Sequence, residues 1–314
     1  MVDDVITFVG FANGDIIIEH AQDHVNKAME FMEKYFTKYE YHIILRERLS
    51  RAVAHHSGGF YDLGEVRDLI TPELSKDILS LSVVFHDLGK HYSTFQKPLR
   101  GIKPDGGHAE GLREPSFAGH EGISALVFLP VLAKSLEIFF EGSTAACKPH
   151  DICRYVSWIL SGYASTSILL HHHSMVQRHD KVWKLTKDFL SKLARGCPLK
   201  HLIVGWPEFF VAMVKKYVSI KALRDAIANE IIDGVCLEDL NNSWRLLFAR
   251  NTGSERSLWS YVGVCSILYA LEAVDNLAAQ EIRKTSPPRV VWQIVSQVLS
   301  SRAVLRDSLK KLGV

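Results

Sequence analysis

The sequence has little of what marks several large classes of protein. Its 314 residues carry 37 Lys and Arg against 35 Asp and Glu, and this net charge of +2 is too mild for a dedicated nucleic-acid binder. The five cysteines form no Cys-x-x-Cys pair, and an odd number fits poorly with a disulfide framework. No run of about 18 uninterrupted apolar residues occurs, and the N-terminus does not resemble a signal peptide. We therefore expect a cytoplasmic protein in which any basic surface is local.

The pattern of apolar residues predicts an almost entirely helical chain that begins with a β-hairpin. Asn13-Gly14, between the apolar runs 6–9 and 16–18, is typical of a tight hairpin turn. Helical spacing then predicts helices over residues 21–35, 72–88, 121–140, 152–160, 166–178, 182–193, 207–232, 237–249, 257–283 and 288–310. No repeat or long flexible linker interrupts them. We expect one all-α domain over residues 1–314, with loop insertions, a core of about residues 15–285 and the C-terminal helix packed on it.

Residues 83–90 are the end of an apolar helical run that leads into His86 and Asp87, with Gly89 and Lys90 after them. Thr71 and Pro72 form a typical helix start, and the run is expected to reach Leu88 and end at Gly89. Its last turn carries His86 beside Asp87. A buried imidazole beside a buried carboxylate is unfavourable unless a charged group pairs with them, and a metal cation is such a partner. The segment therefore indicates a metal site.

The chain has 15 histidines, and several lie where a side chain is directed inward. His20 and His24 are one helical turn apart, His120 begins an apolar helix after a glycine, and residues 171–173 continue an apolar helical face. Asp275 interrupts an apolar stripe, so it needs a strong partner: either the same metal or a buried Arg. The alternative for each histidine alone is a surface or satisfied core position. We expect the pair at 55 and 56 to be of that surface kind.

The order of these motifs resembles the HD-superfamily metal phosphohydrolases, and more narrowly the HD nuclease subunit of type I CRISPR interference systems. The resemblance covers about residues 5–285. It is carried by Glu19-His20, by His86-Asp87-Leu-Gly-Lys90 with Phe95-Gln96, by Phe117–Ala125 around His120, by His171-His172, and by Val274-Asp275-Asn-Leu-Ala-Ala. It implies an HD-domain helical bundle and an enzyme, a metal-dependent DNA nuclease.

The resemblance also implies two metal positions that share one carboxylate. The first would be held by His20, His86, Asp87 and Asp275, and the second by Asp87, His120, His171 and His172. Two choices stay open, because His24 could replace His20, and the working pair of the triple run could be His172 and His173.

Imidazole and carboxylate ligands together suit Mn²⁺, Fe²⁺, Co²⁺ or Ni²⁺ better than Ca²⁺, and Mg²⁺ accepts so many nitrogens reluctantly. Two such ions suit in-line hydrolysis of a phosphodiester. Lys90 would then act as a catalytic residue that offsets charge on a phosphate oxygen, unless it is only an exposed lysine near a helix end.

The expected substrate is single-stranded DNA. A loop expected to be long and exposed, Tyr92–Phe117, could contact phosphates through Lys97, Arg100, Lys103, His108 and Arg113, with help from Lys215-Lys216. The chain has no Gly-x-x-x-x-Gly-Lys-Ser/Thr motif of a helicase. The resemblance is therefore to the stand-alone, archaeal type I-A form, and it implies a separate helicase subunit and a crRNA-guided surveillance complex as partners. The alternatives are an HD nucleotide phosphohydrolase or cyclic-nucleotide phosphodiesterase, and an HD-like module without catalysis.

Overall fold

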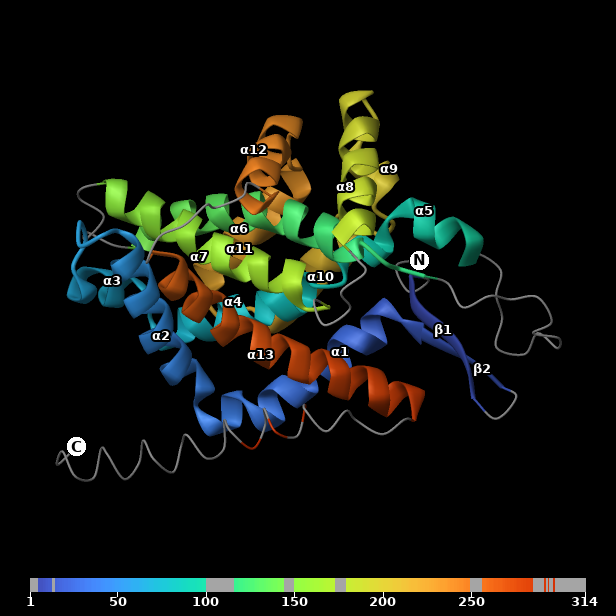
Figure 1. Cartoon of the computed structure of the whole chain (residues 1–314), viewed down its shortest axis with the longest axis horizontal. Coiled ribbons are helices and arrows are strands. Elements are labelled where there is room, and N and C mark those ends of the chain that lie inside the picture. Colours follow the sequence, from blue (N-terminus) through green and yellow to red (C-terminus); the bar gives the residue numbers. More distant parts are fainter. Residues whose placement is uncertain are drawn as a thin grey trace.

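The computed structural model of the chain describes residues 5–12, 15–99, 116–143, 150–172, 179–248 and 256–284, together with Val291, Gln293 and Ser296. These residues form a mostly helical body with one two-stranded antiparallel sheet (Figure 1). The expectation of an all-α protein with an N-terminal hairpin is confirmed. The C-terminal helix expected at 288–310 lies outside the described residues apart from the three named positions.

The elements follow in this order: β1 (Ile6–Ala12), β2 (Asp15–His20), α1 (Ala21–Tyr35), η1 (Thr37–Tyr39), α2 (Tyr41–His56), α3 (Leu63–Leu69), α4 (Pro72–Phe85), η2 (Leu88–His91), α5 (Ser93–Gln96), η3 (Lys97–Leu99), α6 (His120–Ser143), α7 (His150–Leu170), α8 (His179–Ala194), α9 (Leu199–Leu202), α10 (Glu208–Tyr217), α11 (Lys221–Asp233), α12 (Leu237–Phe248) and α13 (Arg256–Arg283).

The core is built around α4, whose side chains are buried from Leu74 to Phe85 with few interruptions. α6 packs along α7, and α13 packs along α1, α2 and α7. α13 crosses the front of the body, while α8 and α12 project from its upper side (Figure 1). Segments far apart in the sequence therefore meet around the end of α4.

A buried amide links the hairpin to the helical body. Ile6 N donates to Gln96 Oε1 (3.1 Å), and Gln96 Nε2 donates to the carbonyl oxygens of Ile6 (2.8 Å) and Lys90 (2.7 Å). β2 pairs with β1 in the register Ile6 with His20 and leads directly into α1. The hairpin thereby sets where α1 begins. The Asn13-Gly14 turn itself lies outside the described residues.

The helix at 72–85 starts as expected and ends earlier than expected. The Thr71 hydroxyl accepts a hydrogen bond from Leu74 N (3.1 Å), with Pro72 in the first turn. α4 stops at Phe85, so the prediction that it continues to Leu88 and ends at Gly89 is wrong. Gly89 serves another purpose, because a Cβ there would lie 2.0 Å from a backbone carbonyl oxygen of α6. The glycine permits this close approach.

Other boundaries also differ from the sequence prediction. The stretches 152–160 and 166–178 belong to one helix, α7, up to Leu170. The stretch 207–232 is two helices, because Asp77 accepts hydrogen bonds from Ser219 N, Ser219 Oγ and Ile220 N and so starts a new helix there. α2 and α3 were not predicted, although Leu45, Leu49 and Ala52 carry a helical spacing. The expected loop after residue 92 begins as ordered structure, α5 and η3.

Two features bear on the compartment of the protein. α6 and α13 contain segments long and apolar enough to cross a membrane, but 78% and 72% of those segments are buried inside the protein. Core helices of soluble proteins pass the same test, so this is weak evidence. Of the described cysteines, Cys197, Cys236 and Cys265 are free and Cys153 is disulfide-bonded, where the sequence gave no reason to expect a disulfide.

Candidate metal centre

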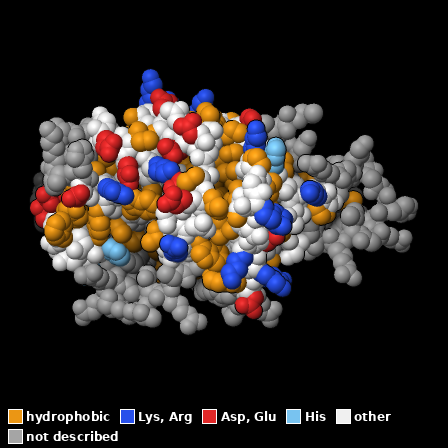
Figure 2. Space-filling model, turned by 90° about the horizontal axis from the view of Figure 1, so that it is seen from above, with side chains coloured by type: hydrophobic (Ala, Val, Ile, Leu, Met, Phe, Trp, Pro, Cys, Tyr) orange, Lys and Arg blue, Asp and Glu red, His pale blue; other side chains and the backbone are white. Residues whose placement is uncertain are grey.

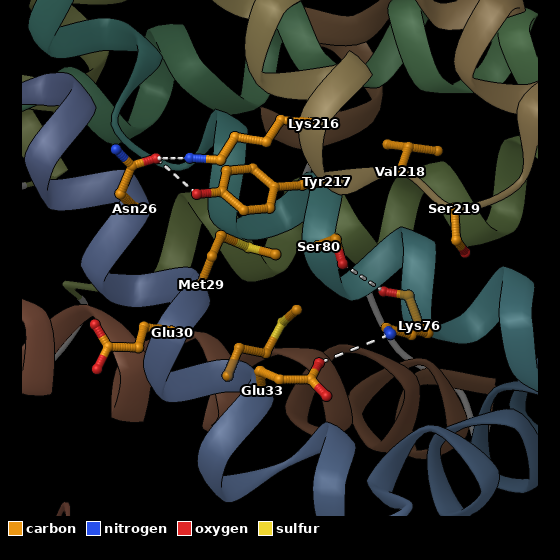
Figure 3. A pocket seen from close by; sticks show the side chains of 11 residues that line it. Asn26, Met29, Glu30, Glu33, Lys76, Ser80, Lys216, Tyr217, Val218 and Ser219 are labelled. Carbon is orange, nitrogen blue, oxygen red and sulfur yellow. Dashed lines mark hydrogen bonds and ion pairs between the residues drawn. The ribbon is translucent and has the colours of Figure 1, made fainter.

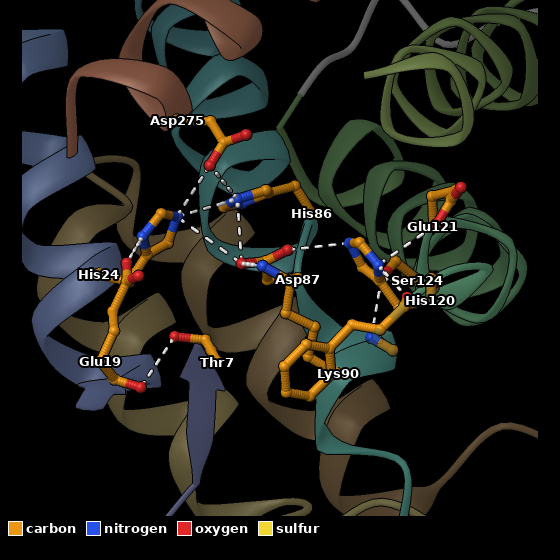
Figure 4. Close-up of polar contacts among 12 residues, drawn as sticks. Thr7, Glu19, His24, His86, Asp87, Lys90, His120, Glu121, Ser124 and Asp275 are labelled. Carbon is orange, nitrogen blue, oxygen red and sulfur yellow. Dashed lines mark hydrogen bonds and ion pairs between the residues drawn. The ribbon is translucent and has the colours of Figure 1, made fainter. Parts of the chain in front are cut away.

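Side chains from five parts of the chain converge beyond the C-terminal end of α4. Figure 4 shows those from α1, from the end of α4, from α6 and from α13. They form two groups of potential metal ligands. The first group is His24, His86 and Asp275, and the second group is Asp87, His120, His171 and His172. Within each group, one ligand atom from each residue lies within 4.8 Å of the others. These buried groups could hold a metal ion.

The end of α4 directs two neighbouring side chains to different places. His86 keeps helical backbone angles (φ −58°, ψ −35°), whereas Asp87 leaves them (φ −99°, ψ 8°). The turn is then fixed to α6, because Gly89 N donates to Ser124 Oγ (2.8 Å) and that hydroxyl donates to the carbonyl of His120 (3.1 Å). The close contact at Gly89 thus holds the segment that carries His86 and Asp87 against the start of α6, which carries His120.

In the first group the polar atoms face one another at short range. His24 Nε2 lies 3.1 Å from Asp275 Oδ1 and 3.3 Å from His86 Nε2. His86 Nε2 lies 3.5 Å from Asp275 Oδ1. The alternative that a buried Arg pairs with Asp275 is not what the described residues show, since its carboxylate faces the two imidazoles.

Asp87 lies between the two groups and offers one oxygen to each. Its Oδ2 is 3.5 Å from His86 Nε2 and 3.6 Å from His24 Nε2. Its Oδ1 is 3.0 Å from His120 Nε2, on the other side of the carboxylate. The rings of His171 and His172 complete the second group, with His171 packed against the rings of both His86 and His120 (5.3 and 5.4 Å between centroids).

Four of the imidazoles are oriented in the same way. Each uses Nδ1 to donate to a fixed oxygen: His24 to the carboxylate of Glu19, His86 to the carbonyl of Val83 (2.7 Å), His120 to that of Phe117 (2.8 Å) and His171 to that of Ile168 (2.5 Å). Because an oxygen of a carbonyl can only accept, Nδ1 carries a proton in the last three, and Nε2 is directed at the centre. Metal-binding histidines are usually held in this manner.

Electrostatics require positive charge in the centre. Burial alone would raise the pKa values of Asp87 and Asp275, but the adjacent His86, with Lys90 beside Asp87 and His24 beside Asp275, holds both well below their usual value. Burial would lower the pKa of His24, yet Glu19 and Asp275 raise it to about 10. A proton on His24, or a metal cation in its place, balances the adjacent carboxylates of Glu19 and Asp275.

The second group contains an imidazole that stays neutral. Burial, together with His86 and His120, lowers the pKa of His171 to about 3, so its ring stays neutral. Asp87 Oδ1 and His120 Nε2 face each other at 3.0 Å, but neither of them, nor the buried His171 Nε2, makes a hydrogen bond to a described residue. Unpaired buried polar atoms are costly, and three of them aimed at one point fit a cation ligand set of imidazole and carboxylate.

Lys90 belongs to the centre and is not an exposed lysine near a helix end. Only 7% of its surface is exposed, and Nζ donates to Asp87 Oδ2 (2.8 Å). The amine also lies 5.8 Å from the centroid of the Phe117 ring. It is therefore held beside the shared carboxylate.

Of the two alternatives His20 and His24, the structure brings His24 into the first group. His20 ends β2 with an extended backbone (φ −94°, ψ 148°), one residue before α1. His24 is one turn inside the helix, on the buried face with Val25 and Ala28. Helical periodicity could not separate the two positions, because the boundary between strand and helix decides which one points inward. His171 and His172 are brought together as assigned, and His173 lies outside the described residues.

Glu19 is the residue whose role the sequence reasoning missed. It is fully buried, and it accepts from His24 Nδ1 on one oxygen and from Arg283 Nε (2.9 Å) and Nη2 (2.8 Å) on the other. Burial would raise the pKa of Glu19, but His24 and Arg283 lower it below its usual value. The sequence signal for this role was the position of Glu19 next to His20 in the motif, because a carboxylate buried on a strand needs a charged or hydrogen-bonding partner.

Other residues considered from the sequence lie away from the centre. His55 is exposed and His56 half-buried at the end of α2, outside both groups. Lys97 is exposed on η3, whereas the expected phosphate contacts at positions 100, 103, 108 and 113 lie outside the described residues.

Lys216, on α10, donates to Asn26 Oδ1 (2.9 Å) at the edge of a cavity of about 460 Å³ between α1, α4 and α10 (Figure 3). None of the ligand residues lines that cavity.

The arrangement can bind one or two cations in a buried site with a lysine beside the shared carboxylate. Comparison with known families, curated proteins and solved structures finds no match to this chain. The chemistry of the centre therefore has to be argued from its own geometry.

Proposed function

We propose that the protein is a metal-dependent phosphodiesterase of the HD type, a nuclease that cleaves single-stranded DNA in type I CRISPR interference. The observation that carries the proposal is the position of Asp87, which offers one oxygen to each of two adjacent histidine groups. A carboxylate shared in this way is what a pair of cations in one hydrolytic site requires.

The donor set limits which cations fit. Five imidazoles and two carboxylates surround the centre, and this mixture suits Mn²⁺, Fe²⁺, Co²⁺ or Ni²⁺ better than Mg²⁺ or Ca²⁺. Bound there, two such ions would lower the pKa of water and stabilise both the attacking and the leaving oxygen in an in-line displacement at phosphorus.

The residues of the chain would position the substrate. Among the seven ligand residues only His172 is partly exposed, so a phosphate reaches the centre from its side. Lys90 Nζ, already held by Asp87, can offset negative charge that grows on a non-bridging oxygen. The Nδ1 bonds of the histidines keep their Nε2 atoms in place during the reaction.

The more specific part of the proposal rests on the resemblance to stand-alone HD nucleases. The residues that carry the resemblance are also those that form the two groups, with His24 in place of His20. As in that family, a separate helicase subunit and a crRNA-guided surveillance complex would be the partners of this chain.

The test is hydrolysis by the protein stripped with a chelator and reloaded with each of the four transition metals. Labelled single-stranded DNA should be cut, and a panel of nucleoside triphosphates and cyclic nucleotides should not. Asp87→Asn should abolish cleavage, while Asp77→Asn, a buried carboxylate on the same helix but outside the centre, should retain it. Turnover of free nucleotides alone would replace the nuclease assignment with a nucleotide phosphohydrolase or cyclic-nucleotide phosphodiesterase.

A further inference from the structure

Positive charge is concentrated in one short part of the chain. Residues 179–202, which include α8 and α9, hold six Lys and Arg against two Asp, a net charge of +4 within 24 residues. The whole chain carries only +2, so the remainder is slightly acidic. Such an asymmetry is a property of a local surface and is hidden in the overall composition.

These basic side chains are available at the surface. The exposed ones are Lys181, Lys184, Lys187, Arg195 and Lys200. Among the described residues, the ion pairs of this segment involve only Lys192 with Asp188 (2.9 Å). Figure 2 looks down on the upper side of Figure 1, and Lys and Arg gather on the part of that face where α8 and α9 lie. We call the exposed stripe of Lys181, Lys184 and Lys187, at three-residue spacing, the basic stripe.

An aromatic ring lies beside the basic stripe. Trp183 is 41% exposed, and Lys187 Nζ lies 4.6 Å from its ring centroid. The indole is also in contact with Trp244 of α12, with 4.5 Å between centroids and a tilt of 47° between the rings. A partly exposed indole among lysines is a surface on which an unpaired base can stack while phosphates meet the cations.

α8 touches both segments that form the walls of the metal centre. At its first turn, a Cβ on Gly119, the residue before His120, would lie 3.0 Å from the carbonyl oxygen of Lys181. At its last turn, Lys192 Nζ donates to Tyr92 Oη (2.6 Å), two residues beyond Lys90. The basic stripe therefore runs along α8 from the turn before one ligand towards the turn after the lysine of the centre.

We propose that the basic stripe of α8, continued by α9, is a binding track for the phosphate backbone of a single-stranded polynucleotide. This inference rests on the proposed function and adds the surface on which the extended strand binds outside the metal centre. Lys181 and Lys187 lie six residues apart on α8, so the stripe spans about 9 Å, which matches about three phosphates of a stacked strand. The track supplies the affinity that a small, buried centre cannot supply for a long polyanion.

The test compares two triple variants. Lys181→Glu/Lys184→Glu/Lys187→Glu changes the basic stripe, and the control changes three lysines that are also exposed but lie on α1, η1 and α11: Lys34→Glu, Lys38→Glu and Lys221→Glu. Both variants alter the net charge equally. Binding of a labelled 20-nucleotide single strand is measured by anisotropy in chelator over a range of salt, and hydrolysis of bis(p-nitrophenyl) phosphate is measured with metal.

The stripe variant should bind the strand at least ~10-fold more weakly, and the slope of log affinity against log salt should fall by about 2, since each lost phosphate contact removes about 0.7. The control variant should bind like the wild type. Hydrolysis of the small diester should be the same in all three proteins.

Equal losses in both variants, or no loss in the stripe variant, would overturn the track. Binding of anionic phosphatidylglycerol vesicles through the stripe, with strand binding unchanged, would overturn it in favour of a membrane surface. Failure of the proposed function has a separate signature, because then the wild type hydrolyses neither the strand nor the small diester with any metal, whatever the anisotropy shows.

Discussion

Replacing Asp87 by Asn should separate the two tasks of this carboxylate, which are to neutralise Lys90 and to hold cations. The side chain keeps its size and an oxygen that can accept from Lys90 Nζ, but it loses its charge. Both partners are almost completely buried, with 3% and 7% of their surface exposed. Breaking a buried ion pair by removing one charge typically costs about 3–5 kcal/mol. We expect the lower end, about 3 kcal/mol, because one hydrogen bond can persist.

The second task is visible only with metal. A cation at 100 times its dissociation constant raises the free energy of unfolding of the wild type by about 2.7 kcal/mol for each independent site. Because Asp87 faces both groups, Asp87→Asn should lose most of this increment. Urea denaturation in chelator and in Mn²⁺, followed by circular dichroism, measures both quantities on the same protein.

Asp77→Asn is the matched control, because Asp77 is a buried carboxylate of α4 that caps the next helix through Ser219 and Ile220. It should lower stability equally with and without metal. If Asp87→Asn kept the full metal-dependent increment, the shared carboxylate would not be a ligand, and the reasoning from its two oxygens would fail.

Three further predictions follow from the packing and from the ligand geometry. Gly89→Ala should lower the free energy of unfolding by about 3 kcal/mol, because its Cβ would meet a carbonyl oxygen at 2.0 Å. Gly162→Ala, with open space around the position, should raise the free energy of unfolding by about 0.5 kcal/mol. Equal stabilities of the two variants in urea denaturation would contradict the close contact at Gly89. His24→Ala should weaken metal binding strongly and His20→Ala only slightly, as measured by calorimetric titration, and the reverse result would restore the original assignment. Tyr41→Phe should cost about 1 kcal/mol at neutral pH through the lost hydroxyl bond to a carbonyl of α13. Burial raises the pKa of Tyr41 to about 12 from the usual 10, so the stability it contributes is complete below pH 10 and is lost between pH 10 and 12, and the variant should show a smaller alkaline loss over that range.

Local signals in the sequence were sufficient for most of the helices and for the hairpin. Thr71 caps α4 and Pro72 occupies its first turn as expected, because capping depends on a few neighbouring residues. The same locality explains the errors. The break between α10 and α11 comes from Asp77, some 140 residues earlier in the chain, and no window around Ser219 contains that information.

For the candidate centre, the sequence by itself determined which residue types were placed on buried helical faces: an imidazole and a carboxylate at the end of α4, histidines at the ends of α6 and α7, and Asp275 on an apolar stripe. Only the tertiary structure decided that His24 and not His20 faces the others, that Glu19 holds its ring, and that Asp87 divides its oxygens between two groups. The physical reason is that periodicity fixes the face of a helix, whereas the distance between atoms on different helices is set by how those helices pack.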